Sequence, residues 1–182
     1  MTTGSPARDK GSGSWQIVSA AEKTQGATLV YGDLVHLKNM YPGAGYLDNC
    51  GWIVDLPFYK GWAEQGALFA VFTTHTKNRD SGTGTWIVVS AESKSAGSSV
   101  LEKDRILLQN TFVGPWRKGS GSPRPAFLDG SDRLPSLVPE FKISGSGLQV
   151  FLSDNPKRHN NSSTWSILFS ESDFSESDAG IR

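Results

Sequence analysis

The sequence predicts an all-β fold, a pseudosymmetric barrel built from two complete four-strand repeats and part of a third. Three observations lead to this prediction. The same residue types recur at the same spacings, the recurring segments alternate apolar with polar residues, and Gly, Ser, Asn, Asp and Pro separate these segments. Helical periodicity is weak and confined to residues 64–71, so helices are not expected to build the core.

Each repeat begins with an expected strand that carries a tryptophan and, two residues later, Ile or Val. The three tryptophans are Trp15, Trp86 and Trp165. Seven residues before them lie, respectively, Arg8, Arg79 and Arg158. We expect the indoles to be buried around a common axis. The arginines are expected to serve the structure, by pairing with aspartates or by stacking on the indoles.

The second strand of each repeat follows an aspartate, 18 residues after the tryptophan, and ends at an asparagine six residues later. The aspartates are Asp33 and Asp104, and the asparagines are Asn39 and Asn110. We expect the aspartates to accept hydrogen bonds from turn amides and the asparagines to bond main-chain groups. The third strand begins with an aromatic residue, Leu and Asp, at 46–48 and at 127–129.

The fourth strand, at 69–72 and 148–151, ends 14 residues before the next tryptophan. These spacings indicate a single domain over residues 1–182. It holds repeat 1 at about 8–78, repeat 2 at about 79–157 and a partial repeat 3 at about 158–182. Two ways to complete the barrel remain open: residues 52–70 supply extra strands, or a partner chain covers the open edge.

The order of these motifs resembles the MIR-type β-trefoil repeat of protein O-mannosyltransferases and of inositol trisphosphate and ryanodine receptors, over most of residues 8–170. The motifs are Trp-x-Ile, Gly-x-x-(Leu/Val)-(Val/Leu)-x-x-Asp-x-(Val/Ile)-x-Leu-x-Asn, aromatic-Leu-Asp and Val-Phe. The resemblance implies a β-trefoil-like architecture and no particular activity. The Leu-Asp element is also similar to the sugar sites of ricin-B-like lectins, which implies that Asp48 and Asp129 contact a carbohydrate, although the Gln-x-Trp signature of those lectins is absent.

Charge and hydropathy exclude several kinds of partner. Eighteen basic residues balance eighteen acidic ones, so no summed positive field draws the protein to nucleic acid. The longest apolar run is the six residues 67–72, too short to span a bilayer. The sequence shows no secretory signal, and the single cysteine, Cys50, suits a reducing compartment, so we predict a cytoplasmic protein.

The residue types that carry catalysis or bind metals are not grouped in the sequence. They fall in different expected elements without metal-ligand spacing, at His36, Cys50, His75 and His159. We therefore expect no catalytic residue, no metal and no cofactor, and predict that the protein is not an enzyme.

Aromatic and basic residues in loops that differ between the repeats are the remaining candidates for function. The first hypothesis is a non-catalytic interaction or structural subunit that contacts other protein chains through these loops and the chain ends. Its contact residues are Trp52, Phe58, Tyr59, Trp62, Trp116, Arg117, Lys118 and Arg124. Two plainer interpretations are a satellite cluster of rings under a long loop and, for residues 114–125, a solvated loop.

The alternative function is a soluble, lectin-like module that binds carbohydrate. Its candidate residues are Asp48, Asn49, Trp52 and Asp129. Pseudosymmetric lectins generally repeat their sugar residues, whereas Asn49 and Trp52 after the first Leu-Asp become Gly130 and Arg133 after the second. This difference lowers the carbohydrate hypothesis below that of a protein partner.

Overall fold

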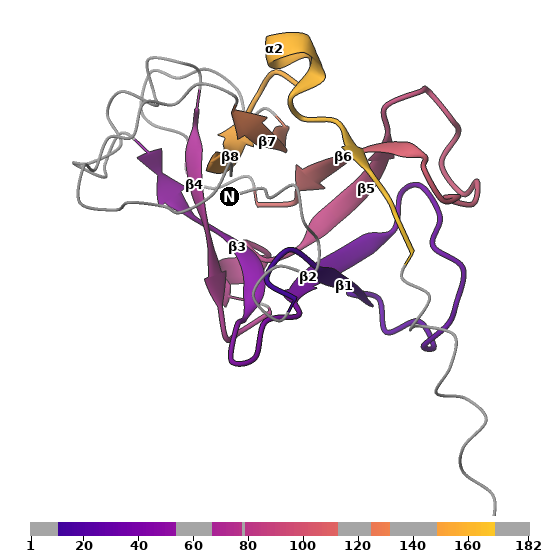
Figure 1. Cartoon of the computed structure of the whole chain (residues 1–182), viewed down its shortest axis with the longest axis horizontal. Helices are drawn as coiled ribbons and strands as arrows, with labels where there is room; N and C mark the ends of the chain where they lie inside the picture. Colours follow the sequence, from indigo (N-terminus) through magenta and orange to yellow (C-terminus); the bar gives the residue numbers. More distant parts are fainter. Residues whose placement is uncertain (1–10, 54–66, 78, 113–124, 132–148, 170–182) are drawn as a thin grey trace, which may run out of the picture.

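The computed structural model describes residues 11–53, 67–77, 79–112, 125–131 and 149–169 (Figure 1). These residues form nine strands, together with the single turns η4 (Arg79–Ser81) and α2 (Arg158–Asn161). The strands are β1 (Trp15–Ser19), β2 (Leu34–Asn39), β3 (Tyr46–Trp52), β4 (Phe69–Thr74), β5 (Trp86–Ser90), β6 (Arg105–Asn110), β7 (Ala126–Ser131), β8 (Gln149–Ser153) and β9 (Trp165–Ser166). The all-β prediction is confirmed.

Seven strands close into an antiparallel barrel. The ring runs β2-β3-β4-β8-β7-β6-β5 and returns to β2. Two short pairings join its halves: Leu34 and Val35 pair with Ile87 and Trp86, and Phe69 and Ala70 pair with Leu152 and Phe151. The ring therefore closes within the described residues and without residues 54–66, which lie outside them.

The two remaining strands lie on the outside of this ring. β1 pairs with β2 along its whole length, from Trp15 opposite Asn39 to Ser19 opposite Val35 (Figure 1). β9 pairs with β6, with Trp165 opposite Ile106.

Alternate residues of the barrel strands fill the core, because successive side chains of a strand point to opposite faces. Buried apolar side chains of this core include Val35, Leu37, Trp86, Val88, Ile106, Leu108, Leu128 and Leu152. Burying each one contributes about 1.5–3 kcal/mol relative to leaving it in water. The hydrophobic alternation seen in the sequence thus corresponds to the inner face of the barrel.

Two turns outside the barrel repeat the same hydrogen bonds. The Asp33 carboxylate accepts the Val30 amide and the Lys23 ammonium, and the Asp104 carboxylate accepts the Leu101 amide and the Lys94 ammonium. The expectation that both aspartates cap turns is confirmed. Asp104 also accepts the hydroxyl of buried Tyr31 at 2.7 Å.

The asparagines that end the second strands also behave as expected. The side-chain amide of Asn39 donates to the Ser12 carbonyl, and the side-chain amide of Asn110 donates to the carbonyls of Thr83 and Thr85. Each side chain therefore satisfies main-chain groups where its strand ends.

The expectation that all three repeated tryptophans are buried is wrong for one of them. Trp86 is fully buried and Trp165 packs partly buried against the core, but Trp15 is 37% exposed. The reason lies in strand order. One edge of β5 pairs with β2, and the equivalent edge of β9 pairs with β6. The corresponding edge of β1 pairs with no described strand, because β1 pairs with β2 through its other edge.

Candidate functional site

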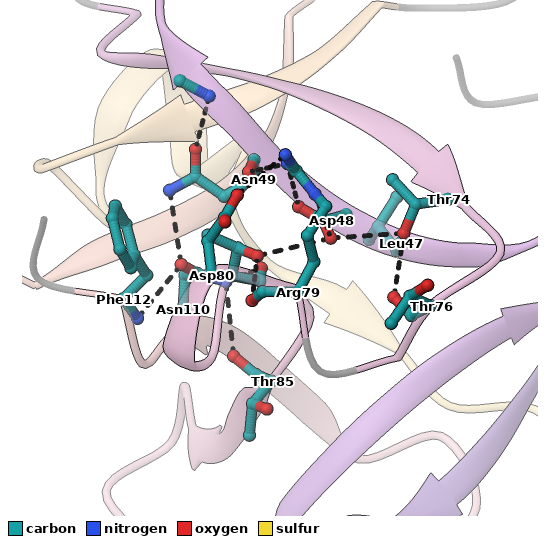
Figure 2. Close-up of polar contacts among 12 residues, drawn as sticks. Leu47, Asp48, Asn49, Thr74, Thr76, Arg79, Asp80, Thr85, Asn110 and Phe112 are labelled. Atoms are coloured by element: carbon teal, nitrogen blue, oxygen red, sulfur yellow. Dashed lines mark hydrogen bonds and ion pairs between the residues drawn. The ribbon is translucent and has the colours of Figure 1, made fainter.

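The Leu-Asp segment of β3 places a carboxylate inside the protein. Asp48 is fully buried, and its Oδ1 lies 2.9 Å from Nη2 of Arg79, which sits in η4 (Figure 2). The hydroxyls of Thr74 and Thr83 each lie 3.3 Å from Oδ2. We term these four residues the Asp48 cluster.

The turn after β4 holds Arg79 in place. The Thr83 hydroxyl lies 2.7 Å from the Arg79 carbonyl, and Nη2 of Arg79 also donates to the Asn49 carbonyl. Asp80, in a left-handed conformation (φ 45°), pairs with Nη1 of Arg79 at 2.8 Å. The hydrogen bond to Asp48 raises the pKa of the Arg79 guanidinium, so this group keeps its positive charge.

A second cluster is built in a similar way, and three of its four residues stand at the positions that the sequence spacing pairs with the first; Ser163 lies one residue after the counterpart of Thr83. Asp129 on β7 is fully buried, and its Oδ2 lies 3.1 Å from Nε of Arg158 in α2. The hydroxyls of Ser153 and Ser163 lie 2.9 and 3.0 Å from the same oxygen. The Arg158 guanidinium also stacks over the Phe151 ring, 4.5 Å from its centroid. We term the first four residues the Asp129 cluster.

Beside each cluster, an indole reaches the leucine that precedes the aspartate. Nε1 of Trp86 donates to the Leu47 carbonyl at 3.2 Å, and Nε1 of Trp165 donates to the Leu128 carbonyl at 3.0 Å. Each Leu-Asp segment therefore binds an arginine and a tryptophan that come later in the chain. The sequence predicts arginine–aspartate pairing without specifying the partners, although these arginines and aspartates recur with a shared period that could have identified them.

The side chains proposed for carbohydrate binding lie inside the protein. Asp48 and Asp129 have no exposed surface, and Asn49 is 1% exposed. The Trp52 ring packs on Phe69, with 4.4 Å between ring centroids. In these positions the aspartates hold arginines and hydroxyls, and a sugar in solvent does not reach them. A buried and an exposed carboxylate look alike in a sequence.

Of the eight predicted partner-contact residues, Trp52 alone is described, half-buried against the core. The other seven lie outside the described residues: Phe58, Tyr59, Trp62, Trp116, Arg117, Lys118 and Arg124. Within the described part of the chain no three His, Cys, Asp or Glu side chains are placed to hold a metal ion. Cys50 is exposed, and His36 is buried with Nδ1 2.8 Å from the Gly84 carbonyl.

The structure leaves exposed one tryptophan that the sequence predicts to be in the core, together with other apolar side chains on β1 and after β2. On β1, Trp15 and Ile17 are each 37% exposed, whereas Trp86 and Val88, at the same places on β5, are fully buried. Met40 and Tyr41, which follow β2, are exposed as well. We term Trp15, Ile17, Met40 and Tyr41 the β1 surface. A sequence signal existed, since Trp86 and Trp165 each follow a Leu-Asp segment in this sequence and Trp15 does not.

Comparison with known proteins supports the fold alone. No protein-family model and no curated protein matches the chain. A solved structure of a Caenorhabditis elegans protein of unknown function is similar, with a TM-score of 0.55 and 17% sequence identity over 85% of this chain and 69% of that chain. No helix in the described ranges is long and apolar enough to cross a membrane.

Proposed function

We propose that the protein is a non-catalytic subunit that contacts other protein chains, built as a β-trefoil-like barrel of two four-strand repeats and part of a third. The matching contacts of the Asp48 and Asp129 clusters support the two repeats. The equivalent Trp86–Leu47 and Trp165–Leu128 hydrogen bonds support β9 as the first strand of a third repeat. A cytoplasmic location belongs to this proposal and rests on the single cysteine.

The exposure of Trp15 and Ile17 is the observation that carries the interaction role. Their counterparts Trp86 and Val88 on β5, which pairs with the neighbouring β2, are fully buried. The same side chains thus lose their exposed surface where a neighbouring strand covers them. Aromatic side chains are enriched at interface centres, where their burial provides much of the binding energy. We propose the β1 surface as a contact site, together with the residues predicted from the sequence: Trp52, Phe58, Tyr59, Trp62, Trp116, Arg117, Lys118 and Arg124.

The carbohydrate alternative has no comparable support. Both aspartates that it requires are fully buried and paired with arginines, and Asn49 is buried beside them. The burial of these side chains favours a protein partner over a carbohydrate.

Photo-crosslinking tests this proposal. A photoreactive residue replacing Ile17, on the β1 surface, is expected to form crosslinks to another protein chain in the cells that make the protein. The matched control replaces Leu101, which is 60% exposed and lies between β5 and β6, and should form none. Trp15→Ser should reduce the crosslinks from position 17. No crosslinked chain at position 17, or equal yields at both positions, would refute the β1 surface as a contact site.

A further inference from the structure

We propose that the outer edge of β1 binds an antiparallel β-strand from a different protein chain. This inference rests on the proposed function, because it assumes a protein partner, and it specifies how that partner binds. Two features of the molecule support it: the direction of the hydrogen bonds along β1, and two places where this chain covers an equivalent strand with another of its own strands.

The main-chain groups of Ile17 point away from β2. The Ala20 amide donates to the Leu34 carbonyl, and the Met40 amide donates to the Ser14 carbonyl. Since bonded and non-bonded residue pairs alternate in an antiparallel ladder, Gln16 and Val18 also bond to β2. The N–H and C=O of Trp15 and Ile17 therefore face the opposite edge, where no described residue pairs with them.

β5 shows how such an edge is covered. The Val88 amide, equivalent to that of Ile17, donates to the Asp33 carbonyl at 3.0 Å, and the Val88 carbonyl accepts the Gly32 amide at 2.8 Å. Trp86 lies opposite Val35 in this pairing. Gly32, Asp33 and the first residues of β2 thus bond to this edge and cover the indole.

β9 repeats the arrangement with different residues. The Ile167 amide donates to the Asp104 carbonyl at 3.3 Å, and the Ile167 carbonyl accepts the Lys103 amide at 2.8 Å. Trp165 lies opposite Ile106. The covering strands β2 and β6 therefore share one pattern. Directly before each strand lies an aspartate, followed two residues later by a β-branched apolar residue that lies opposite the tryptophan.

The indole adds a second requirement for the partner. Trp86 and Trp165 each donate to a leucine carbonyl of the covering part of the chain. In the described part of the chain no group accepts the N–H of Trp15. We therefore expect the partner chain to place a main-chain carbonyl where it accepts this N–H. This hydrogen bond would fix the orientation of the bound strand, in addition to the apolar area that it buries.

A folded second copy of this chain does not offer such a strand. β2 already pairs with β1 and β5, and β6 already pairs with β5 and β9, so both strands of this pattern have both edges occupied. The geometry therefore points to a different chain that contributes the strand, by the addition of a strand to an open sheet edge.

A peptide probe tests this mode of binding on the full chain. The peptide carries residues 29–39, LVYGDLVHLKN, which hold the Asp33–Val35 pattern. In the protein alone, the Ile17 amide should exchange with solvent faster than the Val88 and Ile167 amides. At a peptide concentration of about ten times Kd, exchange at Ile17 should slow by about tenfold. A scrambled peptide is the control and should leave the rate unchanged.

Two variants separate strand addition from other contacts. Ile17→Pro removes the outward N–H while Gln16 and Val18 keep the ladder to β2, and proline is tolerated at the solvent side of an edge strand. Peptide binding should be lost in Ile17→Pro and kept in Ile17→Val, with similar melting temperatures. If Ile17→Pro does not fold, Trp15→Phe, which removes only the indole N–H, should weaken peptide binding by about tenfold.

Three results would overturn the proposal. One is an Ile17 amide already protected in the isolated monomer, which would mean that the chain covers its own edge. Another is no protection by the peptide, and the third is equal binding by Ile17→Pro and Ile17→Val. If crosslinks from position 17 persist while the peptide fails, a protein partner exists and strand addition alone is wrong. If the crosslinks fail as well, the proposed function itself is wrong.

Discussion

The indole Nε1 of Trp86 donates a 3.2 Å hydrogen bond to the main-chain carbonyl of Leu47, 39 residues earlier in the chain. The next residue, Asp48, binds the guanidinium of Arg79. Two adjacent residues of β3 thus hold the strand and the turn that begin the second half of the chain. In the same way, the Trp165 indole donates to the Leu128 carbonyl and Arg158 pairs with Asp129. These contacts therefore join successive parts of the barrel.

Replacing Trp86 should destabilise the protein far more than replacing Trp15. Trp86 is fully buried, and Trp86→Ala leaves a large cavity that should cost about 3–5 kcal/mol in the free energy of unfolding. Trp15→Ala should cost about 1–2 kcal/mol, because the ring is already partly in water. Urea unfolding of both variants measures the difference. Equal losses would mean that Trp15 is covered in solution.

The two arginine–aspartate pairs should respond differently to loss of the carboxylate. The Arg79 side chain is 36% exposed and can turn to water in Asp48→Asn, which should cost about 1–2 kcal/mol. The Arg158 side chain is only 9% exposed and turns to water less easily, so Asp129→Asn breaks a more buried ion pair and should cost about 3–5 kcal/mol. Urea unfolding ranks the variants, and a larger loss for Asp48→Asn would contradict the burial argument.

Acid should weaken the protein through Asp104. Its hydrogen bonds from the Leu101 amide, Lys94 and Tyr31 lower the pKa of this carboxyl from 3.8 to about 2. Because the folded pKa lies below the unfolded one, the stabilisation is fully present above pH 3.8 and is lost as the pH falls towards about 2.

Asp104→Asn should remove this part of the pH dependence, measured as the unfolding free energy across that range. The matched control is Asp33→Asn in the corresponding turn, which leaves Asp104 and its titration intact. An unchanged pH profile in Asp104→Asn would show that other carboxylates account for the acid sensitivity.

Gly45 should not tolerate a side chain. A Cβ built there would lie 1.9 Å from the Thr74 carbonyl oxygen, a main-chain atom that cannot move aside cheaply. Gly45→Ala should therefore cost about 3 kcal/mol or more in thermal or urea unfolding. Gly43→Asn is the control, since nothing lies within 4 Å of that Cβ and asparagine accepts the positive φ of 80°. A Gly45→Ala variant as stable as this control would refute the close approach.

Much of the fold could be predicted from local patterns. Alternation and turn residues place strands at Trp15, Leu34, Tyr46 and Phe69, and again at the matching positions of the second half. The roles of Asp33 and Asp104 followed from their turns, because a short side chain bonds amides only a few residues away. These properties depend on neighbours along the chain.

The sequence by itself thus determined the strands, their repeated spacing and the turn contacts. The tertiary structure decided which strand covers which. It closed the ring through β4 and β8, turned Asp48 and Asp129 inward onto arginines, and buried Trp86 while leaving Trp15 exposed. The physical reason is that an alternating strand reveals its apolar face but not the neighbour that removes that face from water, and this neighbour comes from tens of residues away in the chain.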